Sequence, residues 1–395
     1  MMLDQETIRE ATRLTHAGQL AEATALLQRM LRGERSPDVK SRTAERICLP
    51  SREPLTIDVK ANHVYETGNP YMAHARSVRG LQPLFDRAKD GSWLGMRGVN
   101  RTPPSKGDLA PAGAKFIEAA YSNPAGSRAY KLFVPSGYRG HPIPLVVMLH
   151  GCTQSPDDFA AGTRMNFMAE EQTCFVVYPA QRSDANQSKC WNWFRTADQQ
   201  RDRGEPSLIA GITRQIMRDY SVDPTRVYVG GLSAGAAAAA IMGEAYNDLY
   251  AAVGIHSGLA CGAATDMPSA FAAMRQGGGP GRRVISGHRP PAIIFHGDRD
   301  TTVHPTNGSQ VIEQAIGTTR TQKTVHRGQI AGGHGYTRTT YTEAGGREIL
   351  EHWNIHGAGH AWSGGSPAGS YTDPQGPDAT REMLRFFLEH SLPEK

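Results

Sequence analysis

A serine flanked by glycines is the residue of this sequence best suited to act as a nucleophile. The motif GLSAG, residues 231–235, follows an apolar segment, residues 226–230, and precedes an alanine-rich segment, residues 234–246. A strand that turns sharply into a helix holds a serine hydroxyl out of a sheet, and glycines tolerate the crowding of that turn. The N-terminus of the helix also favours developing negative charge. GxSxG is common by chance, so this context is what predicts that Ser233 is a nucleophile.

A nucleophilic serine requires a general base, and the base requires an orienting acid. In one widespread arrangement these residues follow the serine in the order Asp or Glu, then His. Asp298 and Asp300 follow an apolar, strand-like segment, and His356 and His360 lie in a glycine-rich segment before the last helical pattern. Either aspartate could simply hold a turn, and each histidine is one of 15 in the chain. The residues alone leave two candidates for each role.

A hydrolytic serine also needs an oxyanion hole made of two backbone N–H groups. We expect one from Ala234, the residue after the candidate nucleophile. The other is expected from Cys152, in the segment LHGCTQ (residues 149–154) at the end of an apolar stretch. An ordinary strand-to-helix turn would have the same pattern there.

Aromatic residues supply candidate substrate contacts. Trp191 and Trp193 lie in the segment CWNWF, and they would form either core or a wall of the substrate cleft. Together with Trp362 they are the predicted substrate-binding residues. No cofactor is expected. No metal is expected either, because His356 and His360 have metal-like spacing but lie in a glycine-rich loop rather than on a helix.

The elements that must position these residues alternate between strands and helices from about residue 113. Alternation of this kind predicts a mostly parallel sheet flanked by helices, the architecture of the α/β-hydrolases. The expected strands cover residues 127–138, 143–151, 174–180, 226–233, 251–258 and 291–298. The expected helices cover residues 155–172, 207–220, 234–246, 306–316 and 379–390.

The N-terminal third has a different character. Residues 1–33 show helical apolar spacing in two stretches and predict a helical hairpin, for which docking or homodimerisation is the natural use. Residues 34–112 are rich in Pro, Gly and Arg and predict a linker or a segment that wraps the next domain. The catalytic domain is expected to cover residues 113–395.

Composition limits the classes of function. The net charge of +5 is spread along the chain without a dense basic block, which favours solubility over nucleic-acid binding. No stretch approaches the roughly 18 apolar residues of a membrane span. The first residues do not have the pattern of a signal peptide, so a cytoplasmic location is the default expectation. Five cysteines without a CxxC pair argue against a zinc ribbon or a redox motif.

The combined motifs resemble the polyhydroxybutyrate depolymerase-type esterases, whose relatives include feruloyl esterases. The resemblance covers roughly residues 115–390. It rests on LHGCTQ, CWNWF, GLSAG, YAAVGIHSGLACG, FHGDRDTTVHPTNG and GAGHAWSGG. It implies that Asp300 is the acid and His360 the base, and that Cys152 and Cys190 form a disulfide. Members of that family are commonly secreted.

These features predict a serine esterase that acts through an acyl-enzyme on polyhydroxyalkanoate, another polyester or short-chain hydroxyacyl esters. One alternative is a feruloyl or acetyl esterase that acts on plant polysaccharide esters. Another is a non-catalytic protein that binds polymer or granules through the N-terminal hairpin.

Overall fold

The computed structural model of the chain describes residues 104–278 and 289–393. The predicted hairpin of residues 1–33 and most of the predicted linker lie outside the described residues. The end of that linker includes the short helix α4 (Lys106–Leu109). The carbonyl of Leu109 accepts a hydrogen bond of 2.7 Å from the side-chain amide of Asn166, so this end of the linker contacts the sheet domain.

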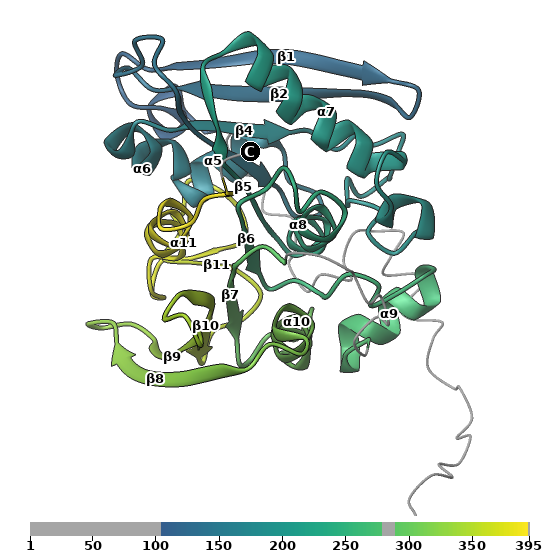
Figure 1. The fold of residues 1–395 in the computed structure, drawn as a ribbon, viewed down its shortest axis with the longest axis vertical. Coiled ribbons are helices and arrows are strands. Elements are labelled where there is room, and N and C mark those ends of the chain that lie inside the picture. The colour runs from purple at the N-terminus through teal and green to yellow at the C-terminus, as the bar shows by residue number, and fades with distance from the viewer. Residues whose placement is uncertain (1–103, 279–288, 394–395) are drawn as a thin grey trace, which may run out of the picture. The chain divides into compact units, whose positions relative to one another are not determined.

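A ten-stranded sheet in the order β1-β2-β4-β3-β5-β6-β7-β10-β9-β8 forms the centre of this domain (Figure 1). Strands β4, β3, β5, β6, β7 and β10 are parallel, and antiparallel strands flank them at both edges. The bounds are β1 (Lys115–Asn123), β2 (Gly126–Val134), β3 (Ile143–Leu149), β4 (Phe175–Pro179), β5 (Val222–Leu232), β6 (Ala252–His256), β7 (Ala292–Gly297), β8 (Thr321–Gln329), β9 (Gly335–Glu343) and β10 (Glu348–His356). Two short strands, β11 (Trp362–Ser363) and β12 (Thr372–Asp373), form a separate pair.

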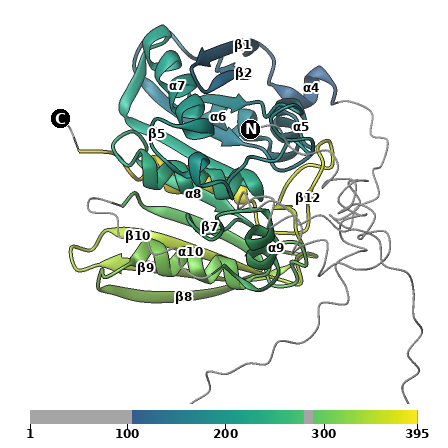
Figure 2. The same cartoon turned by 90° about the vertical axis from the view of Figure 1, so that its right-hand side faces the viewer.

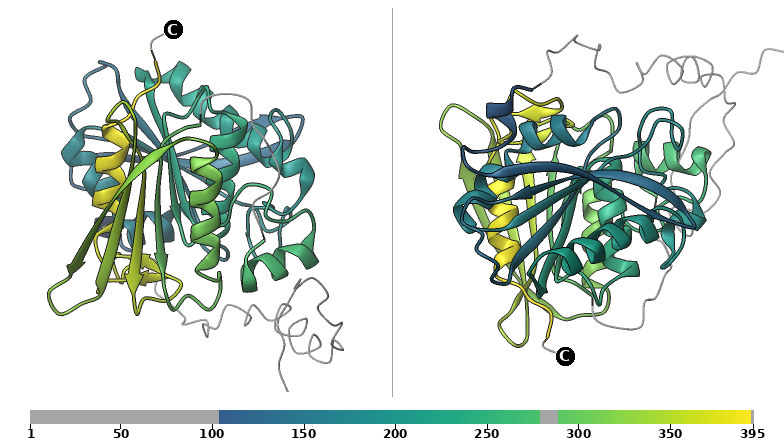
Figure 3. Two further views of the ribbon diagram at one scale, coloured as in Figure 1. Left: turned by 60° about the horizontal axis from the view of Figure 1, so that its bottom comes forward. Right: turned by 90° about the horizontal axis from the view of Figure 1, so that it is seen from above.

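Helices cover both faces of the parallel strands (Figures 1 and 3). One face carries α5 (Pro156–Thr163), α6 (Met165–Gln172) and α11 (Ala379–Leu388). The other carries α7 (Gly204–Asp219), α8 (Ala234–Ala245) and α10 (Thr306–Ile316). Every residue of β3, β4, β6 and β7 is buried, as expected for strands covered on both faces. The remaining helices are α9 (Met267–Gln276) and the 3₁₀ turn η2 (Thr196–Gln199).

The sequence missed several elements. Strands β1, β8, β9 and β10 were not predicted, and the segment 320–350 forms the outer strands on the β8 side of the sheet (Figure 2). The predicted helix 155–172 is two helices, because Arg164 has a left-handed φ of 55°. Helix α9 was also missed.

Strand order brings the candidate acid and base segments together. Strands β7 and β10 are parallel neighbours, paired from Leu350↔Ala292 to Ile355↔Gly297. The segments that leave their carboxyl ends therefore lie side by side, although about 60 residues separate them in the chain. None of the helices in the described part of the chain combines the length and apolarity that crossing a membrane requires.

Candidate active site

Ser233 occupies a strained turn between β5 and α8. Its φ of 58° and ψ of −119° lie outside the regions that side chains ordinarily favour, and its backbone N–H donates to the carbonyl of His256 at 2.9 Å. A side chain at Gly235 or Gly231 would overlap the backbone oxygen of Leu149, which explains both glycines of the motif. The turn leaves Ser233 as the N-cap residue of α8.

Asp300 is a buried carboxylate, and both of its oxygens have hydrogen-bond partners. Its Oδ1 accepts the backbone N–H groups of Thr302 and Val303 at 2.9 and 2.8 Å. Its Oδ2 lies 2.7 Å from Nδ1 of His360. Burial alone would raise the pKa of Asp300, but hydrogen bonds and the nearby rings of His296 and His360 hold that pKa below its ordinary value. The carboxylate is therefore an anion that accepts the Nδ1–H of His360 and leaves Nε2 free.

The other candidate acid and base, Asp298 and His356, also form a pair. Nδ1 of His356 lies 3.0 Å from Oδ2 of Asp298, and Oδ1 of Asp298 accepts the backbone N–H of Gly357 at 2.7 Å. Both side chains are more than a third exposed, in contrast to the buried pair of Asp300 and His360. The structure thus contains two parallel Asp–His pairs that join the same two segments.

His360 and Ser233 line one small hollow, together with Gly151, Cys152, Leu232 and Tyr371. Among the described residues, the Ser233 hydroxyl has no hydrogen bond to the His360 ring, and this bond is often long in free enzymes. Tyr371 was not anticipated from the sequence. Its hydroxyl lies 2.9 Å from Oγ1 of Thr153 across the hollow. No motif in the sequence signals that contact.

Cys152 lies in a turn whose neighbouring N–H groups are already bound. The N–H of Gly151 donates to the side chain of Gln154 at 2.9 Å, and that of Thr153 donates to the carbonyl of Ser188 at 2.7 Å. In the described part of the chain, the N–H of Cys152 has no hydrogen-bond acceptor. Its side chain forms the disulfide with Cys190 that the family resemblance implied.

A larger cavity of about 430 Å³ also borders Ser233. Cys152 and Ala234 line it as well, together with the loop of residues 183–188. Trp193, one of the predicted substrate contacts, lines it. The segment 320–350 does not line this cavity in the described structure.

Trp191 and Trp362 are not available as substrate contacts, because both rings are fully buried in the core. Nε1 of Trp191 donates to the carbonyl of His150 at 3.1 Å, and Nε1 of Trp362 donates to Oγ1 of Thr380 at 2.9 Å. Their predicted role in the cleft is therefore corrected to a structural one. Trp191 thus bonds the segment that carries His150, and Trp362 bonds helix α11.

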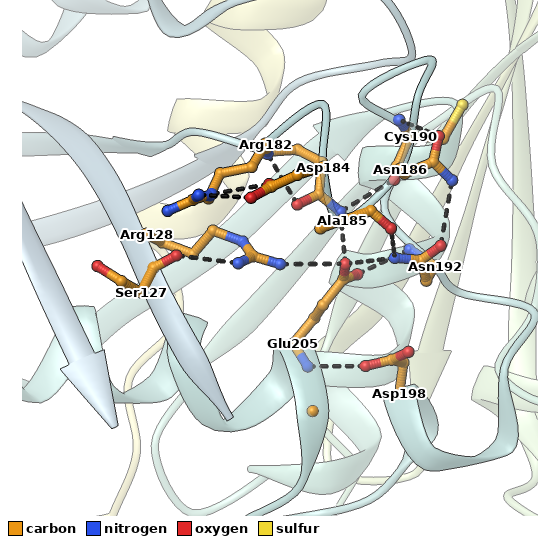
Figure 4. Close-up of polar contacts among 12 residues, drawn as sticks. Ser127, Arg128, Arg182, Asp184, Ala185, Asn186, Cys190, Asn192, Asp198 and Glu205 are labelled. Atoms are coloured by element: carbon orange, nitrogen blue, oxygen red, sulfur yellow. Dashed lines mark hydrogen bonds and ion pairs between the residues drawn. The ribbon is translucent and has the colours of Figure 1, made fainter. Parts of the chain in front are cut away.

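A buried carboxylate holds the cavity loop in place (Figure 4). Glu205 is 6% exposed, and its side chain accepts the backbone and side-chain N–H groups of Asn192, both at 2.7 Å. Gln181 and Arg128 donate to the same carboxylate. Asn192 contacts Asn186, whose Oδ1 accepts the N–H groups of Ser188 and Cys190. This network fixes the loop that carries Cys190.

The described residues contain no group of three or more His, Cys, Asp or Glu side chains placed to hold a metal ion. A serine at a strained strand-to-helix turn, beside a buried Asp–His pair at the carboxyl ends of parallel strands, is the site architecture of the α/β-hydrolases. The acetyl xylan esterase from Aspergillus awamori has the same fold, with a TM-score of 0.51 at 21% identity over 62% of this chain and 93% of that one.

The family follows from the sequence match. The family model described as "Esterase PHB depolymerase" matches residues 128–325, about half of the chain, and the chain belongs to this family. Poly(3-hydroxyalkanoate) depolymerase C of Paucimonas lemoignei is 35% identical over 60% of this chain and 59% of its own length. A probable acetylxylan esterase A of Aspergillus clavatus is 26% identical over 49% of this chain and 67% of its own. The chain thus spans about three fifths to two thirds of these relatives.

Proposed function

We propose that this protein is a serine carboxylic ester hydrolase that acts through an acyl-enzyme on polyhydroxyalkanoate or short-chain hydroxyacyl esters. The observation that carries the proposal is the shared hollow of Ser233 and the buried Asp300–His360 pair, in a chain of the esterase PHB depolymerase family. The similarity to a poly(3-hydroxyalkanoate) depolymerase supports the substrate class.

In the proposed mechanism, Nε2 of His360 takes the proton of the Ser233 hydroxyl while Asp300 holds the Nδ1–H. The Ser233 oxygen attacks the ester carbonyl carbon, and the oxyanion accepts the N–H groups of Cys152 and Ala234. The protonated His360 then donates to the departing alcohol oxygen. Water attacks the acyl-enzyme with the same base, releases the acid and restores Ser233.

Two features favour Asp300 and His360 over the more exposed pair of Asp298 and His356 as acid and base. His360 borders the hollow that contains Ser233, whereas His356 does not line it in the described structure. Among the described residues the N–H of Cys152, next to that hollow, has no acceptor, and Ala234 begins helix α8, whose N-terminus favours an oxyanion.

Hydrolysis of p-nitrophenyl esters, a hydroxybutyrate oligomer and an amorphous polymer film tests the proposal, with Ser233→Ala as the blank. We expect the substitution to lower kcat by roughly 10⁴-fold or more. Near-full activity of Ser233→Ala would contradict the nucleophile. Activity on small esters but not on oligomer or film would contradict the polyester substrate class.

The similarity to acetylxylan esterases supports a second candidate, an esterase that removes acetyl groups from a polysaccharide. Acetylated xylan and a feruloyl ester in the same panel separate these candidates. A role of residues 1–33 in homodimerisation or granule docking stays a prediction. Comparing the oligomeric state and granule co-sedimentation of the full chain with those of a chain lacking residues 1–33 tests it.

A further inference from the structure

Helix α9 turns its apolar stripe toward the large cavity. Met267, Ala270, Phe271 and Met274 follow the i, i+3, i+4, i+7 spacing of one helix face, and all four line the cavity beside Ser233. Such a stripe ordinarily packs against a core. Here Met267 is 46% exposed and Met274 is only partly buried. Apolar side chains that line a cavity beside the proposed nucleophile favour an apolar ligand.

Helix α9, which lines this part of the cavity, is held by hydrogen bonds near both of its ends. Asp266 and Ser269 form a capping box at the start of α9. At its end, the carbonyl of Ala273 accepts a hydrogen bond of 2.9 Å from the buried side chain of Asn307, and the carbonyl of Met274 accepts one of 2.7 Å from the N–H of His304. The cavity therefore exists before any ligand binds, so binding does not require the wall to become ordered.

The remaining walls divide into an apolar and a polar side. Trp193 and Phe194 pack edge to face with ring centroids 5.8 Å apart, and Val303 adds to the same apolar lining. The loop of residues 183–188 supplies the polar side. A volume of about 430 Å³ is within the range of whole-ligand pockets and far exceeds the needs of an acetyl group.

The position of His360 assigns this cavity to one end of the substrate. The base must reach the departing alcohol oxygen in order to protonate it. His360 borders the small hollow and not the large cavity, whereas Ser233 borders both. The alcohol part therefore leaves on the side of the hollow, and the acyl part extends into the large cavity.

We propose that this cavity binds an apolar acyl chain several carbons longer than acetyl, and that Ala270 in the α9 stripe limits the length of that chain. The inference rests on the proposed ester hydrolysis and adds a substrate class to it. Each buried methylene contributes up to about fourfold in kcat/KM. We therefore expect the kcat/KM of p-nitrophenyl esters to rise at least about tenfold from acetate to hexanoate.

Ala270→Phe fills the cavity and is the principal test. We expect at least a tenfold loss of kcat/KM on hexanoate and octanoate esters, and less than about a threefold change on acetate. Ala272→Phe is the matched control, because Ala272 is exposed on α9 and is not among the cavity-lining residues. It should leave the whole profile unchanged. Because Ala270 is buried, Phe271→Ala serves as a milder variant that should reduce the ratio of hexanoate to acetate activity.

Hexyl acetate tests which end of the ester occupies the cavity, because its long chain lies on the alcohol. Its hydrolysis should not respond to Ala270→Phe. A selective loss on hexyl acetate would overturn the acyl assignment, and equal losses on acetate and octanoate would overturn the length limit. Ser233-dependent hydrolysis without any chain-length preference would overturn this inference and leave the esterase proposal intact. If no ester were hydrolysed in a Ser233-dependent manner, both would fail.

Discussion

The two Asp–His pairs allow a matched comparison of Asp300→Asn with Asp298→Asn. Both changes replace a carboxylate by an amide of nearly the same shape, and both residues bond a histidine Nδ1 in the same pair of segments. The pairs differ in burial, and of the two histidines only His360 lines the hollow beside Ser233 in the described structure. If Asp300 orients the base, the two variants will differ greatly in activity.

The structure indicates the size of the effect. In Asp300→Asn, Oδ1 can still accept the N–H groups of Thr302 and Val303, so the amide nitrogen must face Nδ1 of His360. Two N–H donors, the side-chain amide introduced by Asp300→Asn and the Nδ1–H of His360, would then face each other. The His360 ring avoids this by carrying its proton on Nε2 instead of Nδ1. A protonated Nε2 cannot accept the proton of Ser233. In a serine protease triad the corresponding change lowers kcat about 10⁴-fold, or about 5 kcal/mol, and we expect a similar loss here.

Asp298→Asn removes a charge from a pair that is more than a third exposed, and Oδ1 can still accept the N–H of Gly357. Exposed ion pairs contribute about 0–1 kcal/mol, so we expect less than about a fivefold loss of kcat/KM. Initial rates on p-nitrophenyl butyrate, corrected with Ser233→Ala, measure both variants, and thermal unfolding verifies that each is folded. Losses within tenfold of each other would refute the assignment of Asp300.

Two further predictions concern the disulfide and the buried histidines. Replacing Cys152 and Cys190 together by Ser should lower the free energy of unfolding by about 4 kcal/mol, because the bridge closes a 38-residue separation. Denaturant unfolding measures this loss, and five reactive thiols in the unfolded, unreduced protein would contradict the bridge. Burial lowers the pKa of His150 to about 4 and that of His256 to about 3, so the unfolded chain binds more protons below its ordinary histidine pKa of about 6.5. Stability should therefore fall as pH decreases from about 6.5 to 4, and a Tm that stays constant from pH 7.5 to 4.5 would contradict this.

The residues near the serine were predictable because local sequence determines them. The strand, turn and helix around Ser233 form one continuous segment, so the motif and its flanking residues indicate them together. The need for glycine at Gly231 and Gly235 arises from a distant contact, the close approach of Leu149 on the neighbouring strand β3. The strands β3, β4, β6 and β7 could also be predicted from continuous apolar segments, because strands buried on both faces contain few polar residues.

The choice between the two acids and the two bases is a different kind of question. Asp298 and Asp300 are two residues apart, and His356 and His360 are four apart, so each acid could pair with either base on sequence alone. Strands β7 and β10 pair in a defined register, and of the two histidines only His360 lines the hollow beside Ser233 in the described structure. Sequence patterns do not reveal register between distant strands.

Strand β8 and Trp191 show two further limits. Strand β8 is an edge strand whose residues are mostly exposed on both faces, so it lacks the alternation that identifies a strand. Its pairing with β9 determines its conformation. Trp191 and Trp193 are two residues apart, and only the path of the loop places one in the core and the other in the cavity wall. Helix α9 did have a signal, an Asp266 N-cap followed by Pro268 and an apolar stripe.

The proposed catalytic residues and the residues proposed to set substrate preference lie on different elements of the fold. The proposed nucleophile, acid and base leave the carboxyl ends of buried parallel strands, where a substitution disturbs the core as well as the reaction. Much of the lining of the cavity comes instead from α9 and the loop of residues 183–188, outside the ten-stranded sheet. On the proposed assignment, changes at Ala270 or Phe271 alter the volume offered to the acyl chain and leave the proposed catalytic residues themselves unchanged. On the proposed assignments, the acyl-chain preference depends on a few side chains of the α9 wall and not on Ser233, Asp300 or His360.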